Sequence, residues 1–413
     1  MCRMTPCAPI HDNDTMGGGP RHVAGRAGTA LAILALAACA ALLGTAAPAR
    51  AASVTCTVAP PSVVYGGTVT VDGTVDPAVE GQEIVVALGG DDVATALTDA
   101  SGAFAVEFAP ARCGFVTSRL TAAGSVSPPA PLAVLPAVSV GHGRLIPFLF
   151  ARVELRVAPA TYDGVVTLRV SHRGRRVATL RGTVRDGRLM LRVPLRGIGW
   201  FGLRFELSPT DELGARVVKK SVKLGWRRLA VGSTGPRVRG LLTQLRRLRV
   251  RVPGVGEAYT SAVADAVMAF QKAYRLPRTY VVDYDDWRRL DCAVRIKPRY
   301  AAPERHLEID KTRQIAMVVD RGSVIGVVHV STGATGNTPE GSFRILRKNP
   351  MSATWDGTVA LPFFMTFHGQ MGLHGYPFVP PYPASHGCVR EPLWVCGWTY
   401  AQSFVGERLY IYH

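Results

Sequence analysis

The chain has 413 residues, more than one hydrophobic core usually holds, so we expect about two to four domains. Its composition, with 47% hydrophobic and 19% charged residues, excludes a chain that is disordered throughout. The net charge of +18 favours anionic partners, but no basic segment with interleaved aromatic residues supports nucleic-acid recognition.

Residues 1–52 are predicted to be a leader. Two arginines precede an uncharged run rich in Ala and Leu at residues 29–47, and residues 49–51 (Ala-Arg-Ala) offer a signal-peptidase site. Three interpretations remain open: a cleaved signal peptide, an uncleaved membrane anchor, or a lipoprotein in which Cys39 ends a lipobox-like sequence. Each places the rest of the chain outside the cytoplasm, either secreted or anchored in the membrane.

Five cysteines follow the leader: Cys56, Cys113, Cys292, Cys388 and Cys396. In an oxidising compartment an odd number favours one thiol that is kept free for chemistry. Cys56 and Cys113 bracket one β-rich segment, so we predict a disulfide between them. Cys292 and Cys396 form a second disulfide or stay unpaired and buried; the sequence leaves both open.

Residues 53–136 are predicted to form a β-sandwich of the immunoglobulin-like kind. Polar and apolar residues alternate in short runs, such as residues 68–71 and 83–88, and glycine-containing turns separate the runs. Prolines between residues 128 and 136 then mark a linker. Because the segment has no cluster of His, Cys or carboxylates, we expect a spacer rather than a catalytic domain.

Residues 137–228 are predicted to form a second β-sandwich. Strands are expected at residues 164–170, 175–184 and 189–193. Asp186-Gly187 is typical of a two-residue hairpin turn. Residues 141–230 contain 19 Lys and Arg against 6 Asp and Glu, whereas residues 52–137 contain 2 against 8. This basic segment suits anionic wall polymers, although an Arg-rich proteome explains the same excess.

Residues 229–295 are predicted to form a small module of three helices. Apolar residues recur at helical spacing in residues 238–248 and 261–274. Thr260 can cap the second helix, and a third short helix follows Asp283.

This helical segment resembles the bacterial peptidoglycan-binding domain that has a Phe-Gln pair in one helix. The matching residues are Gly232-Ser233-Thr234-Gly235-Pro236, Thr260, Phe270-Gln271-Lys272, Leu276-Pro277, Trp287 and Leu290. The resemblance implies that the module binds glycan and so concentrates the rest of the chain on its substrate.

Residues 304–413 are predicted to form another mainly-β domain. Residues 314–319 and 323–330 are apolar strands around a hairpin turn at residues 320–322. A later loop, rich in proline and aromatic residues, ends in the sequence Ser-His-Gly-Cys-Val-Arg at residues 385–390.

Cys388 is the candidate nucleophile in that sequence. A cysteine attacks as thiolate, and its ordinary pKa is about 8.5, so a nearby imidazole has to accept the proton. His386 is attached too close to Cys388 for in-line proton transfer. His374 on a neighbouring strand can approach the sulfur directly, and we predict it as the base.

The neighbours of Cys388 have predicted roles as well. Gly387 leaves space for an acyl group, and the amides of Gly387 and Cys388 can stabilise an oxyanion. Arg390 can bind a substrate carboxylate because its charge is permanent and its donors are forked. Ser385 and His386 complete the predicted set of oxyanion and substrate residues.

Two other interpretations of Cys388 remain open from the residues alone. A lone cysteine is often an inert part of a core. A cysteine with two histidines nearby can also bind zinc, but a fourth ligand and a C-x-x-C pair are missing from the sequence. We therefore predict no metal and no organic cofactor.

Two motifs resemble the L,D-transpeptidase family of the YkuD type. Residues 385–390, with His374-Gly375 upstream, resemble the family's signature, and residues 338–343 (Thr-Pro-Glu-Gly-Ser-Phe) resemble its T-P-x-G-x-F turn. The resemblance covers residues 304–413 and implies a mainly-β catalytic domain with the cysteine in a cleft.

The resemblance also implies specific roles. Cys388 is the nucleophile, His374 is the base, and the backbone around His386, Gly387 and Cys388 forms the oxyanion hole. The enzyme cuts a peptidoglycan tetrapeptide stem after its third residue, releases D-Ala and passes the acyl group to an amine of another stem. The expected function is therefore stem-peptide cross-linking in cell wall biogenesis.

Two alternatives to this function are kept. Water in place of the amine would make the enzyme an L,D-carboxypeptidase, and a non-catalytic wall-binding protein is the third possibility. The expected partners are peptidoglycan stem peptides, glycan and anionic wall polymers, without nucleic acid and with membrane contact only through an N-terminal anchor.

Overall fold

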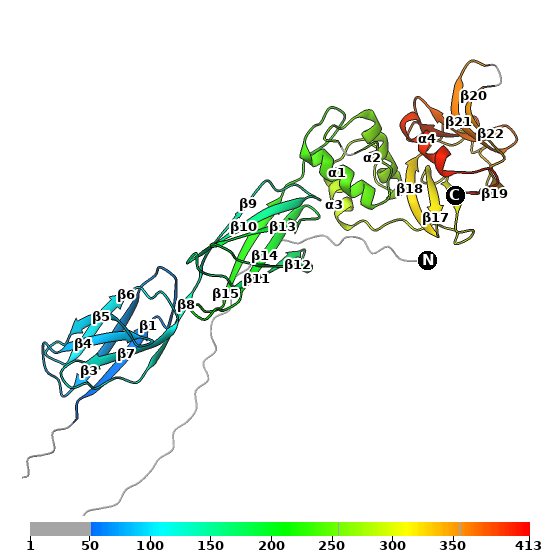
Figure 1. Cartoon of the computed structure of the whole chain (residues 1–413). Helices are drawn as coiled ribbons and strands as arrows, with labels where there is room; N and C mark the ends of the chain where they lie inside the picture. Colours follow the sequence, from blue (N-terminus) through cyan, green and yellow to red (C-terminus); the bar gives the residue numbers. More distant parts are fainter. Residues whose placement is uncertain (1–50, 255, 355–356) are drawn as a thin grey trace, which may run out of the picture. The chain divides into compact units, whose positions relative to one another are not determined.

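The computed structural model describes residues 51–254, 256–354 and 357–413, and in this part the chain is mainly β, as predicted (Figure 1). Nearly all of the predicted leader lies outside the described residues. No described helix is both long enough and apolar enough to cross a membrane. The chain divides into two compact units, described separately below. Among the described residues, one contains residues 51–57, Val71–Val106 and Val116–Ala130, and the other contains Val58–Thr70, Glu107–Phe115 and Pro131–His413.

The first strands form from the predicted alternating runs. β3 (Val69–Asp76) lies between β1 (Ser53–Ala59) and β6 (Ala103–Phe108) in one sheet. β4 (Glu83–Leu88) lies between β5 (Asp91–Leu97) and β7 (Gly114–Leu120), and β2 (Ser62–Val64) pairs in parallel with β8 (Ala130–Leu135). Val69, Val71 and Val75 of β3 are buried, because alternate side chains of a strand face the same side.

The strands from residue 137 to residue 224 form two sheets around one core. One sheet has the order β13 (Arg188–Pro194), β10 (Phe150–Ala158), β9 (Ala137–His142). The other has the order β12 (Arg175–Thr183), β11 (Val165–His172), β14 (Gly199–Leu207), β15 (Arg216–Leu224). Asp186 and Gly187 have φ angles of 49° and 69°, which confirms the hairpin turn predicted there.

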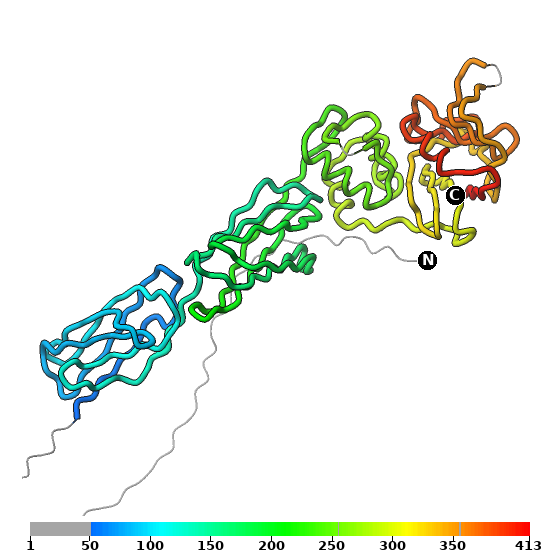
Figure 2. Tube along the Cα trace, viewed as in Figure 1, coloured from blue at the N-terminus to red at the C-terminus, as the bar shows by residue number. Residues whose placement is uncertain are grey.

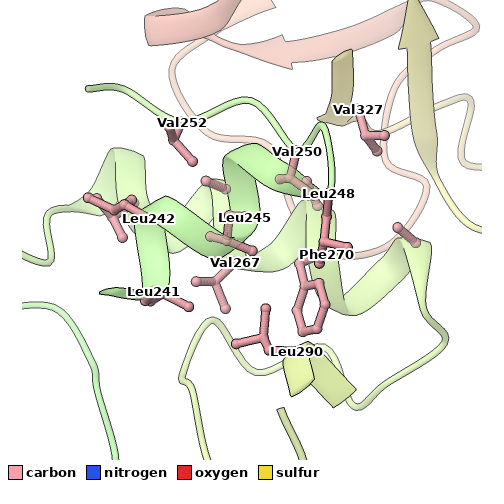
Figure 3. Close-up of a cluster of buried hydrophobic side chains, with 14 of the residues drawn as sticks. Leu241, Leu242, Leu245, Leu248, Val250, Val252, Val267, Phe270, Leu290 and Val327 are labelled. Atoms are coloured by element: carbon pink, nitrogen blue, oxygen red, sulfur yellow. The ribbon is translucent and has the colours of Figure 1, made fainter. Parts of the chain in front are cut away.

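The three predicted helices are confirmed as α1 (Pro236–Arg247), α2 (Ser261–Ala273) and α3 (Tyr284–Cys292). Thr260 caps α2 by accepting from the Val263 amide at 3.3 Å, and Asp283 forms a capping box on α3. Their buried side chains continue into the next domain: Val327 lies in the same cluster as Leu248 and Val250 (Figure 3). The helical module (residues 229–295) and the C-terminal domain therefore share one hydrophobic core.

The C-terminal domain (residues 304–413) contains two sheets and one helix. The first sheet has the order β18 (Ser323–His329), β17 (Ile315–Asp320), β16 (His306–Asp310), β24 (Arg408–Tyr412), β19 (Gly341–Arg344). The second has the order β20 (Arg347–Ala353), β21 (Ala360–His368), β22 (Met371–Tyr376), β23 (Val389–Pro392), and α4 (Leu393–Gln402) packs on it. The end of the chain returns to pair in parallel with β16, where the red tube reaches the yellow segment (Figure 2).

The predicted Cys56–Cys113 disulfide is wrong. The Cys56 sulfur lies 3.1 Å from the Ser127 hydroxyl, whereas the Cys113 sulfur accepts from the Val134 amide at 3.2 Å, and both thiols are free. Both cysteines lie in one β-rich segment of the sequence, but a strand pattern does not say which residues meet.

The Cys292–Cys396 disulfide is not formed either. Cys292 is exposed at the end of α3, whereas Cys396 is buried in α4. The odd number of cysteines therefore gives no reason to single out Cys388, and that assignment depends on the surroundings of the residue.

Candidate active site

His374 lies in β22, and Cys388 directly precedes β23, the strand that pairs with β22. β22 and β23 run parallel, with Leu373 opposite Val389 and His374 opposite Arg390. A backbone hydrogen bond from Gly372 reaches the Cys388 thiol. The neighbouring-strand placement predicted for His374 is thus the observed one.

A cleft of about 1100 Å³ opens over these two residues. Five of the six predicted site residues line it: Cys388, His374, Ser385, His386 and Arg390. Another part of the wall comes from β20 and β21, including Lys348, Asn349 and Phe364. Sequence reasoning missed this wall, because a long-range hairpin contact leaves no local spacing or motif.

His374 is oriented by its own strand. It is buried, its Nδ1 lies 3.0 Å from the carbonyl oxygen of Gly375, and its ring stacks on Phe364 with centroids 5.7 Å apart. A carbonyl only accepts hydrogen bonds, so Nδ1 carries the proton and Nε2 keeps its lone pair. Burial lowers the pKa of His374, and the positive charge of Arg390 acts in the same direction. The imidazole is therefore neutral at neutral pH and can accept a proton.

Cys388 is protonated in the same range. Burial raises the pKa of its thiol, and the Gly372 hydrogen bond and the charge of Arg390 only partly oppose that effect. Both pKa shifts favour a thiol and a neutral imidazole in the resting site.

Ser385 organises the turn that carries the thiol. Its hydroxyl donates to the carbonyl oxygen of Cys388 and accepts from the Gly387 amide at 3.1 Å. The Gly387 amide is therefore occupied, and of the two amides predicted for an oxyanion hole, that of Cys388 remains. Gly387 has a φ of 131°, and a Cβ there would lie 2.8 Å from Met371, so the position favours glycine.

The turn at residues 338–343 supports the same loop. Thr338 Oγ1 donates to the Gly387 carbonyl oxygen and accepts from the Gly333 amide, each at 2.8 Å. Asn337 Nδ2 donates to the His386 carbonyl oxygen at 2.8 Å. The second sequence motif therefore positions the first.

Arg390 presents a fixed cation to the cleft. Its guanidinium lies 4.1 Å from the centroid of the Tyr376 ring, and its backbone bonds that of Ser331 in both directions, at 2.9 and 3.1 Å. Glu391, the next residue, faces the other way. It is fully buried, and burial raises its pKa to about 8.

Within residues 51–254, 256–354 and 357–413, no three His, Cys, Asp or Glu side chains form a group that can hold a metal ion.

The C-terminal part of the chain is similar to known proteins. Residues 304–407 match the family model YkuD, the L,D-transpeptidase catalytic domain. An L,D-transpeptidase structure from Xylanimonas cellulosilytica is 30% identical over 46% of this chain and 100% of that chain, with a TM-score of 0.43. One from Stackebrandtia nassauensis is 22% identical over 45% of this chain and 95% of that chain, with a TM-score of 0.30. No curated protein matches the chain.

Proposed function

We propose that this chain, which carries a YkuD L,D-transpeptidase catalytic domain at residues 304–407, cross-links peptidoglycan stem peptides in cell wall biogenesis through a thioester on Cys388. The observation that carries the proposal is the placement of Cys388 and His374 in one cleft, with the Nε2 of His374 left to accept a proton. The predicted leader pattern supports action outside the cytoplasm.

The first half-reaction forms the thioester. As the Cys388 sulfur attacks the carbonyl carbon of the third stem residue, its proton passes to His374 Nε2. The tetrahedral intermediate then breaks its C–N bond, and the proton on His374 moves to the departing nitrogen of D-Ala. A thiol and a neutral imidazole are the protonation states that this sequence of steps needs at its start.

The intermediate places negative charge on the former carbonyl oxygen. The Cys388 amide is the donor we assign to that oxygen, and Ser385 fixes the turn by holding the amide of Gly387 and the carbonyl of Cys388. Arg390 is assigned to a substrate carboxylate, because its guanidinium is held against Tyr376 at the cleft wall.

The second half-reaction releases the acyl group. An amine of another stem attacks the thioester, loses a proton to His374 and forms the cross-link as the sulfur leaves and is reprotonated. Water in the same position would give L,D-carboxypeptidase activity, so the identity of the acceptor decides between the two functions.

We assign anionic wall polymers to the outer face of β11, β14 and β15. Arg169 lies opposite Arg204, and Arg204 lies opposite Lys219, so three cations form one row across the sheet. Side chains directly opposite each other repel when their charges are alike, and Glu206 is the acid that pairs with Arg169 and Arg204. A polyanion lying along the row would relieve the remaining repulsion.

The test is incubation of the purified chain with disaccharide-tetrapeptide, followed by mass spectrometry. A cross-linked dimer with released D-Ala supports transfer, and a tripeptide without dimer shows hydrolysis. Cys388→Ala is expected to abolish both products, whereas Cys292→Ala, an exposed cysteine outside the cleft, serves as the matched control. A Cys388→Ala protein that still forms dimer would refute the proposed nucleophile.

A further inference from the structure

The loop from Tyr376 to Ser385 connects the two halves of the active site. It follows β22, which carries His374, and leads directly into the turn that carries Cys388. Its last residues are held within the C-terminal domain: the amides of Ala384 and Ser385 donate to the Thr332 carbonyl oxygen at 2.9 and 3.0 Å. Ser331 Oγ, in the same domain, donates to the Tyr382 carbonyl oxygen at 2.7 Å, and Val379 and Pro381 have further partners outside this domain.

The helical module supplies those partners. Tyr280 donates its hydroxyl proton to the carbonyl oxygen of Val379 at 3.0 Å, and Arg278 Nη1 donates to the carbonyl oxygen of Pro381 at 2.7 Å. Arg278 Nη2 also donates to the carbonyl oxygens of Thr312 and Arg313 at 3.2 and 3.3 Å. The segment that contains Arg278 and Tyr280, about 100 residues earlier in the chain, thus holds the active-site loop by hydrogen bonds.

A second connection runs through a buried lysine. Lys272 is 1% exposed, and its Nζ donates to His329 Nδ1 and to the Val330 carbonyl oxygen, each at 2.7 Å. Because Nδ1 accepts, the ring proton of His329 lies on Nε2, which donates to the Val379 carbonyl oxygen at 2.8 Å. Lys272 therefore fixes the tautomer through which His329 holds the loop.

Gln271, beside Lys272 on α2, orients the segment that contains Arg278 and Tyr280. Its Oε1 accepts from the amides of Thr279 and Tyr280 at 3.0 and 3.1 Å, and its Nε2 donates to the Val281 carbonyl oxygen at 2.9 Å. Tyr280 has a φ of 60°, a conformation that these bonds hold in place. The side chains of Gln271 and Lys272 thus point into the chain and form hydrogen bonds with its other residues, and most of α2 is buried.

We infer that the helical module is part of the catalytic apparatus: Lys272 and Tyr280 are positioning residues that set the Val379 carbonyl, and through it the loop that places Cys388. The carbonyl accepts from both Tyr280 and His329, so removing either donor weakens the hold on the middle of the loop. Glycan, if the module binds it, contacts a surface other than the buried face of α2. The inference adds to the function proposed for Cys388 and uses it in one of its two tests.

The test compares three variants of the full chain. Tyr280→Phe removes one hydroxyl and keeps the ring, and Lys272→Met keeps the length of the side chain but removes its donors. Arg251→Met is the matched control. Arg251 also lies where the helical module contacts the C-terminal domain, 4.1 Å from the centroid of the Trp398 ring, but within the described residues it forms no hydrogen bond with the loop. Each variant is first checked for cooperative thermal unfolding.

Kinetics give the first readout. For disaccharide-tetrapeptide we expect kcat to fall roughly 10- to 100-fold in Lys272→Met and about 3- to 10-fold in Tyr280→Phe, because small displacements of a nucleophile cost orders of magnitude. KM should change less than about 3-fold, since the cleft walls are untouched. A folded Tyr280→Phe protein with the kcat of Arg251→Met would overturn the inference.

Amide NMR signals of Gly387 and Cys388 give the second readout, which needs no activity. These signals should shift in Tyr280→Phe and stay in place in Arg251→Met. Unshifted signals in Tyr280→Phe would also overturn the inference. If the wild-type chain has no turnover, the function proposed for Cys388 fails, and the NMR comparison still decides whether the helical module positions the loop.

Discussion

Thr338 Oγ1 donates to the Gly387 carbonyl oxygen at 2.8 Å, so a threonine 50 residues upstream of Cys388 fixes the residue directly before it. The same hydroxyl accepts from the Gly333 amide at 2.8 Å, and Thr338 is fully buried. The two sequence motifs are therefore one structural unit, and a substitution in one should change the geometry of the other.

Thr338→Val should damage both the fold and the activity. The change keeps the shape of the side chain but leaves the Gly333 amide and the Gly387 carbonyl unpaired in a buried place. We expect a loss of about 1–3 kcal/mol in the free energy of unfolding, measured with urea, and a fall of roughly 10-fold in kcat. Thr338→Ser keeps the hydroxyl and should recover most of both; equal damage in the two variants would contradict the role of the hydrogen bonds.

The pH dependence of the reaction follows from the two shifted pKa values. Activity requires neutral His374 and protonated Cys388, so it is lost as His374 gains a proton in acid and as Cys388 loses one in base. Burial lowers the first pKa below 6.5 and raises the second above 9.0, so the profile of kcat/KM should be a broad bell with limbs outside that interval. An acidic limb at or above pH 6.5 would contradict the neutral imidazole.

Alkylation tests the same site without substrate. At pH 7 iodoacetamide should label the exposed Cys292 faster than Cys388, because the pKa of the Cys388 thiol is raised and little thiolate is present. Peptide mapping by mass spectrometry distinguishes the two sites. Preferential labelling of Cys388 at pH 7 would indicate a preformed ion pair with His374.

Much of the fold could be predicted because its signals are local. The cap at Thr260, the hairpin turn at Asp186-Gly187 and the alternation in β3 each involve residues close in sequence. The pairing of Lys272 with His329 spans 57 residues and depends on how two modules pack, which no local pattern reports. The failed Cys56–Cys113 disulfide has the same cause, because a shared β-rich segment does not show which of its residues meet in space.

Glu391→Gln should stabilise the chain at neutral pH and above. The carboxyl is fully buried, and burial raises its pKa from an ordinary 4.5 to about 8. Between these values the unfolded chain releases the proton and the folded chain keeps it, so folding stability falls as pH rises, by up to about 1.4 kcal/mol for each pH unit. The glutamine variant should lose this slope in urea unfolding between pH 5 and 8. Glu304→Gln, at an exposed site, is the control, and an unchanged slope in Glu391→Gln would contradict a buried neutral carboxyl.

Binding to wall preparations should depend on salt and on the row of Arg169, Arg204 and Lys219. All three are exposed, and the row carries three positive charges against the one negative charge of Glu206. If a polyanion lies along it, sedimentation with purified walls should weaken as salt rises, because screening shortens the reach of the charges to about 8 Å at physiological ionic strength. Lys219→Ala should weaken binding and flatten its salt dependence, whereas Arg112→Ala, in a segment outside the basic sheet, should not.

Walls stripped of their anionic polymers should release the wild-type chain to the same extent as high salt. Retention on stripped walls would instead identify peptidoglycan itself as the ligand and contradict binding to an anionic polymer.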